Sequence, residues 1–154
     1  MKPAAWSNSA YLIAGLALYQ VPAIAIFTAL LGVFSFMAHH RGVKWWAADW
    51  AGMYLVFSAI ALHHCGISPW LAIIPAGIGF RYGVGNYIAF GIVWVLAMAS
   101  AQYAGISIII PAIIFAAALA CQINAGRHGS ARYNILHSAW HILAAIAIYL
   151  IVRG

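Results

Sequence analysis

The segment SFMAHHRGVKWWAAD, residues 35–49, connects the end of one apolar run to the beginning of the next. It contains Asp49, the single acidic residue in a chain of 154. A carboxylate beside an apolar run has little water to solvate it, so its presence there predicts a functional site. Ser35 and His39 stand four positions apart and therefore share one face of a helix. This face can point toward Asp49 if the two apolar runs form a helical hairpin.

The composition around this segment is that of a membrane protein. Hydrophobic residues make up 67% of the chain and charged residues 5%, whereas about a quarter of the residues in a soluble domain are charged. A membrane-spanning helix needs about 20 mostly apolar residues. The sequence therefore predicts an all-α, polytopic transmembrane bundle of about six spans, which forms a single integral membrane domain over residues 1–154.

Six apolar segments separated by short polar turns support this prediction. We expect spans at residues 11–38, 45–62, 70–80, 87–101, 106–123 and 135–152. Pro22 lies inside the first segment, where we expect it to kink the helix without ending it. Pro75 interrupts the short third segment.

The basic residues predict an orientation for the bundle. With six spans, Lys2 and Arg153 lie on the side of the two termini, and five basic residues lie on the opposite side: Arg41, Lys44, Arg81, Arg127 and Arg132. Cytoplasmic loops carry the excess of Lys and Arg, so we expect both termini in the periplasm. Because these charges are scattered between spans, they indicate topology, and we expect neither a nucleic-acid partner nor an obligate protein partner.

A second pair with the same spacing of four, His137 and His141, begins the last apolar segment. In the six-span topology, the end of the first span and the starts of the second and sixth all reach the cytoplasmic face. His39 and the second pair then lie at a similar depth. Three imidazoles with a fourth, open position are a common arrangement for catalytic zinc. We therefore expect His39, His137 and His141 to bind Zn²⁺ near the cytoplasmic face.

We expect catalytic roles for Asp49 and Ser35, which lie close to the three histidines in this topology. Zinc lowers the pKa of a bound water to about 7, and a nearby carboxylate can take and return the proton of that water. Asp49 is the only side-chain carboxylate in the chain, so we assign this role to it. We expect Ser35 to hydrogen-bond the water or the oxyanion that forms when the water attacks a carbonyl group.

Structural interpretations of the same residues stay open. The histidines of either pair can hydrogen-bond neighbouring helices, and a serine in a membrane helix is often only a packing residue. Asp49 can form an ion pair with Arg41 or Lys44 instead of serving catalysis. We expect the other histidines at the membrane interface or in solvent, and these are His40, His63, His64 and His128.

The complete pattern resembles the alkaline ceramidase family, within the wider group of intramembrane zinc hydrolases that includes the adiponectin-receptor and haemolysin III relatives. The resemblance rests on Gly32, Ser35, His39 and Asp49, and on the final stretch HSAWHILAAIAIYL at residues 137–150. It implies zinc on the three histidines, Asp49 acting on the zinc water, and Ser35 assisting at the oxyanion. The implied reaction hydrolyses the amide between a fatty acyl chain and a sphingoid base.

Two differences from this family shape the functional hypothesis. Family members usually have seven spans, so six expected segments imply that the first family helix is missing. Eukaryotic ceramidases use N-terminal acidic residues to bind calcium, and this chain has none there. The small size suggests a bacterial inner-membrane protein. We expect a zinc-dependent hydrolase that cleaves a ceramide-like amide or an ester of a membrane lipid; the alternative is a non-catalytic receptor or a metal or ion transporter.

Overall fold

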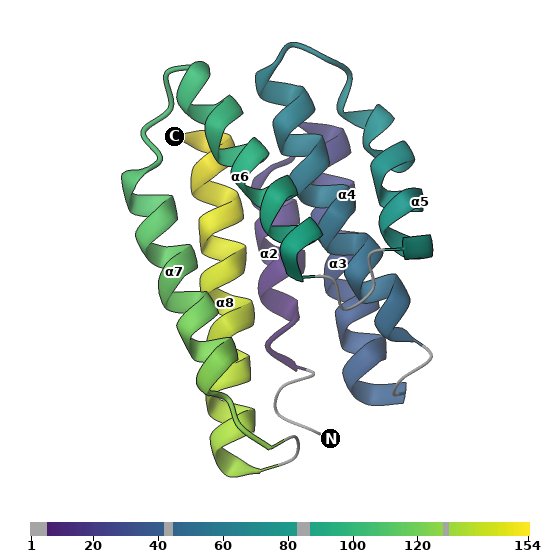
Figure 1. Cartoon of the computed structure of the whole chain (residues 1–154), viewed down its shortest axis with the longest axis vertical. Coiled ribbons are helices and arrows are strands. Elements are labelled where there is room, and N and C mark those ends of the chain that lie inside the picture. Colours follow the sequence, from purple (N-terminus) through teal and green to yellow (C-terminus); the bar gives the residue numbers. More distant parts are fainter. Residues whose placement is uncertain (1–5, 42–44, 83–86, 128–129) are drawn as a thin grey trace.

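The computed structural model describes residues 6–41, 45–82, 87–127 and 130–154, and this part of the chain is helical without strands. The all-α prediction is therefore confirmed (Figure 1). The described elements are α2 (Ser9–Ala17), α3 (Pro22–Arg41), α4 (Trp46–His64), the 3₁₀ helix η2 (Pro69–Ala72), α5 (Ile73–Tyr82), α6 (Tyr87–Tyr103), α7 (Ile109–Asn124) and α8 (Ala131–Arg153).

The first apolar segment forms two helices instead of one. Helix α2 ends at Ala17, and Pro22 is the first residue of α3, which packs back against α2. Proline is suited to this position because its φ angle is already helical and its missing N–H would have no partner in the first turn. The expectation that Pro22 only kinks one long span is therefore wrong. The described residues thus form seven α-helices, one more than the six expected apolar segments.

The other expected segments are helical, with shifted boundaries. Pro75 and Pro111 lie in the first turns of α5 and α7, where a missing N–H costs no helical hydrogen bond. Helix α8 begins before the expected residue 135 because Ser130 caps it: the Ser130 hydroxyl accepts a hydrogen bond from the Tyr133 N–H at 3.0 Å. This earlier start places His137 in the second turn of α8.

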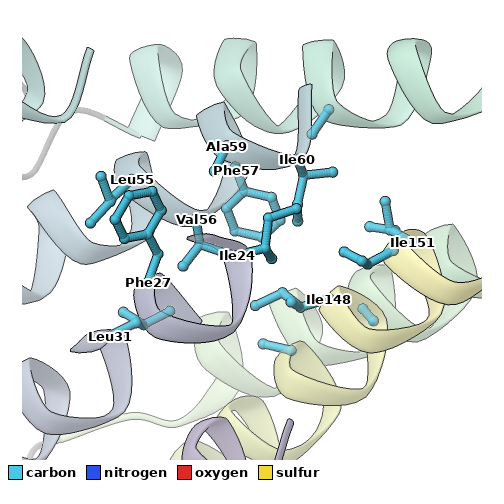
Figure 2. Close-up of a cluster of buried hydrophobic side chains, with 14 of the residues drawn as sticks. Ile24, Phe27, Leu31, Leu55, Val56, Phe57, Ala59, Ile60, Ile148 and Ile151 are labelled. Atoms are coloured by element: carbon cyan, nitrogen blue, oxygen red, sulfur yellow. The ribbon is translucent and has the colours of Figure 1, made fainter. Parts of the chain in front are cut away.

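Helix α4 lies at the centre of the bundle. It packs against α3, α5 and α6, while α8 packs against α7 and α2 (Figure 1). Buried apolar side chains of α3, α4 and α8 meet in the interior (Figure 2), among them Ile24, Val56, Ile60 and Ile148. Most side chains in this part of the interior are apolar, and they pack beside the buried hydroxyls of Thr28 and Ser58.

The described chain begins and ends at opposite ends of the bundle (Figure 1). Helix α2 starts at the end where α3 finishes and α8 starts, and Arg153 closes the opposite end by donating a hydrogen bond to Gln20 Oε1. The placement of both termini on one side followed from the six-span count and is wrong. Lys2 and Lys44, which entered the charge argument, lie outside the described residues.

The outer surface of the bundle is rich in large apolar side chains. Every described α-helix exposes some, for example Leu16 of α2, Ile74 of α5, Ile88 of α6 and Ile113 of α7. Within the described residues, two helices are long and apolar enough to cross a membrane, α3 and α8, and α6 and α7 are shorter apolar helices. An apolar surface of this extent is typical of a protein that contacts lipid or a partner.

A glycine in α5 allows close packing against α4. A Cβ atom on Gly79 would overlap the ring of the buried Tyr54, whereas a Cβ atom on Gly77 would meet nothing within 4 Å. We expect Gly79→Ala to lower the free energy of unfolding by about 1–3 kcal/mol, the usual cost of overpacking. Gly77→Ala, on the same helix, is the matched control and should leave stability unchanged or slightly raised. Denaturant or thermal unfolding of the two purified variants measures this difference, and equal stability contradicts the packing.

Candidate metal centre

Three buried histidines from two helices converge in the interior. His39 lies at the end of α3, and His137 and His141 lie on one face of α8. One ring nitrogen from each lies within 4.8 Å of the others, and the Nε2 atoms of His39 and His137 are 2.9 Å apart. Two nitrogen ligands of a tetrahedral zinc ion are about 3.3 Å apart, given Zn–N bonds of 2.0–2.1 Å. The predicted ligands are therefore close enough to hold one metal ion.

Local helix geometry and the packing of α3 against α4 bring the other two predicted residues together. Ser35 lies one turn before His39 and is 2% exposed. Asp49 lies in the first turn of α4, is partly buried, and accepts a hydrogen bond from the Ser35 hydroxyl. A carboxylate in the first helical turn is also stabilised by the helix dipole. The alternative partner Lys44 lies outside the described residues.

All five predicted residues line one cavity of about 110 Å³, which has room for several water molecules. Most of the remaining wall is aromatic and includes Tyr11, Trp46, Trp50, Phe90, Tyr133 and Trp140. The cavity thus combines a possible metal ligand set, a carboxylate and a hydroxyl within largely apolar surroundings. Such surroundings strengthen electrostatic interactions with a reacting group because little water screens them.

Four residues of the site were missed by the sequence analysis. The Nδ1 atom of His137 lies 2.6 Å from Gln122 Oε1 of α7, and the Nδ1 atom of His141 lies 2.8 Å from the hydroxyl of Ser7, just before α2. The other two are tyrosines: Tyr133 stacks on His137 with ring centroids 4.7 Å apart, and Tyr11 lies 5.9 Å from His141. The sequence does mark Gln122 as a candidate for a buried polar contact, because it is a polar residue near the end of an apolar run.

The other described histidines lie apart from the three predicted ligands. His40 is exposed and stacks on Phe36 with ring centroids 5.6 Å apart. His63 and His64 end α4, at the far end from Asp49, and His64 Nε2–H donates a hydrogen bond to the Ile151 carbonyl at 3.1 Å. His128 lies outside the described residues.

Comparisons of the chain with protein-family models, with curated proteins and with solved structures gave no match. The resemblance to alkaline ceramidases therefore rests on the quoted residues. The structure adds that five of these residues lie together around one cavity: Ser35, His39, Asp49, His137 and His141.

Proposed function

We propose that this protein is a zinc-dependent intramembrane hydrolase that cleaves an amide or ester bond of a membrane lipid. One observation carries the proposal: three buried histidines and a hydrogen-bonded serine–aspartate pair line the same cavity. The histidines match a catalytic metal site, and the aspartate is a proton acceptor beside it. A ceramide-like amide is the substrate class that the sequence resemblance favours.

The donor set supports zinc as the metal. Three imidazoles and no thiolate favour a borderline metal such as zinc, and three protein ligands are the usual number at catalytic zinc sites, which keep one position open. When bound, zinc activates water at neutral pH and polarises a carbonyl oxygen. His39, His137 and His141 would hold the ion.

The protein's own residues would handle the proton and the oxyanion. Asp49 would accept a proton from the water that attacks the carbonyl carbon, and would return it to the leaving amine or alcohol. The Ser35 hydroxyl, which donates to Asp49, orients this carboxylate and can donate instead to the substrate oxygen as negative charge develops. The aromatic wall excludes bulk water from both steps.

A membrane location is supported by the surface of the bundle. Exposed apolar side chains on all described α-helices suit a hydrocarbon solvent, and α3 and α8 meet the length for crossing it. We propose a bacterial inner-membrane bundle with the metal centre near the cytoplasmic face. Two arginines support this orientation: Arg41 lies with His39 in the last turn of α3, and Arg132 lies in the first turn of α8, whereas Arg153 lies at the opposite end of α8.

The apolar interior favours hydrolysis over transport. A metal transported across the bundle would have to pass from His39 toward His63 and His64 at the far end of α4. Fully buried Val56 and Ile60 of α4 pack in the core between these positions (Figure 2). A pathway for an ion needs polar ligands along its length, and along these stretches of α3 and α4 the buried side chains are apolar apart from the hydroxyls of Thr28 and Ser58.

Lipid hydrolysis tests the proposal directly. Purified protein loaded with Zn²⁺ and mixed with a panel of lipid amides and esters, including a ceramide, should release fatty acid that mass spectrometry detects. A chelator should stop the release and added Zn²⁺ should restore it, because the metal activates the water. Metal-loaded protein that releases no product but carries metal ions into sealed vesicles would overturn hydrolysis in favour of transport.

A further inference from the structure

Two hydrogen bonds reach the metal centre from outside the ligand set. Gln122 of α7 contacts the Nδ1 atom of His137 at 2.6 Å, and Ser7 contacts the Nδ1 atom of His141 at 2.8 Å. We infer that Gln122 and Ser7 are positioning residues, which fix the tautomers of His137 and His141 and direct both Nε2 atoms toward the metal. The inference rests on the metal centre of the proposed function and not on the identity of its substrate.

The chemistry of the amide determines the protonation of His137. Its Nδ1 atom faces Gln122 Oε1, and an amide oxygen only accepts hydrogen bonds. Nδ1 must therefore carry the ring proton, which leaves the lone pair of the neutral ring on Nε2. This Nε2 atom is the one that faces His39 Nε2 at 2.9 Å. An acceptor on the outer nitrogen also raises the basicity of the ligating nitrogen.

The same arrangement recurs at His141. The Ser7 hydroxyl can accept a hydrogen bond from Nδ1–H, so it supports the tautomer with the lone pair on Nε2. Each of the two rings also has a tyrosine against it: Tyr133 is nearly parallel to His137, with 13° between the planes, and Tyr11 contacts His141 at a tilt of 57°. A hydrogen bond and a ring contact together restrict rotation of each imidazole.

These contacts tie three parts of the chain to one site. Gln122 belongs to α7, Ser7 precedes α2, and both histidines belong to α8. Removing the acceptor on a ligand histidine should weaken metal binding without removing any ligand. Outer hydrogen bonds of this kind typically contribute ten- to a hundredfold to metal affinity.

A pair of substitutions at Gln122 separates positioning from packing. Gln122→Met keeps the length of the side chain and removes the acceptor, so we expect Zn²⁺ affinity, measured by competition with a chelator, to fall about ten- to a hundredfold. Gln122→Glu keeps an acceptor oxygen and should bind Zn²⁺ at least as tightly as the wild type. Asn124→Ala, on the same helix and exposed, is the control and should leave affinity unchanged. Unchanged affinity in Gln122→Met, or equal losses in Met and Glu variants, overturns the inference.

Ser7 provides a second, independent measurement. Ser7→Ala should lower Zn²⁺ affinity about ten- to a hundredfold, Ser7→Thr should restore it, and Ser9→Ala at the exposed first residue of α2 should have no effect. Unfolding temperatures of the metal-free variants should match the wild type, and equal affinity in Ser7→Ala overturns its positioning role.

The affinity measurement is independent of catalysis. Protein that shows the Gln122 effect but hydrolyses no lipid retains this inference and loses the proposed function. Hydrolysis with unchanged Zn²⁺ affinity in Gln122→Met retains the proposed function and loses the inference. Wild-type protein that binds no divalent metal contradicts both.

Discussion

His39→Ala is expected to abolish both bound metal and lipid hydrolysis, whereas His40→Ala retains both. His39 is 8% exposed and its Nε2 atom lies 2.9 Å from His137 Nε2, so it supplies one of three convergent nitrogens. Its removal leaves two ligands, and we expect Zn²⁺ affinity to fall by more than about a hundredfold, beyond the cost of losing an outer hydrogen bond. Elemental analysis of purified protein and fatty-acid release measure the two effects.

His40→Ala is a stringent control because it changes the same residue type at the next position of α3. The His40 ring is exposed and stacks on Phe36, outside the cavity. Its loss should leave metal content and turnover within about twofold of the wild type, since a surface substitution usually changes stability by less than about 0.5 kcal/mol. Full metal content in His39→Ala, or loss of metal in His40→Ala, contradicts the ligand assignment.

The candidate site was predictable because its residues follow helical periodicity. Ser35 and His39, and likewise His137 and His141, share a helix face through their spacing of four. The sequence also placed Asp49 near the start of the next helix, where the structure has it. Long apolar runs are the part of such a sequence from which helices are most readily predicted. The spacing of the polar residues within these runs then predicts which of them share a helix face.

The division of the first apolar segment into α2 and α3 did not affect this prediction, because the additional helix α2 comes before all five predicted site residues. Splitting the first segment at Pro22 adds α2 before α3 and leaves the helices after α3 as expected. The end of α3 and the starts of α4 and α8 therefore still meet at one end of the bundle. The split changes the end of the bundle at which the described chain begins. Sequence hydropathy does not reveal the split, because residues 11–38 are mostly apolar and the turn before Pro22 adds only Gln20 as a strongly polar residue.

The outer hydrogen bonds of the site were not predictable from the sequence. Ser7 and His141 are separated by 134 positions, and Gln122 and His137 by 15 with a loop between them. No periodicity relates such residues, since their contact depends on how α2, α7 and α8 pack. A lone glutamine in an apolar run indicates a buried polar contact without indicating its partner.

Asp49→Asn is expected to keep the metal and lose catalysis. The asparagine side chain has the same shape, and its amide oxygen can still accept the hydrogen bond from Ser35. It cannot accept a proton from the attacking water, and general base catalysis typically contributes about 10²–10⁴-fold to a rate. We therefore expect the rate of fatty-acid release to fall about 10²–10⁴-fold while the metal content of the purified protein stays at the wild-type level.

Two outcomes for this variant separate the roles that Asp49 can have. Wild-type activity in Asp49→Asn would falsify the general-base role, because no other side-chain carboxylate exists in the chain to replace it. Loss of metal together with activity would instead make Asp49 a support for the ligands. Asp49→Glu distinguishes these further: it keeps a base but moves it by one methylene, so it should retain metal and part of the activity. A proton-transfer role therefore requires that activity follow the presence of the carboxylate while metal content remains constant.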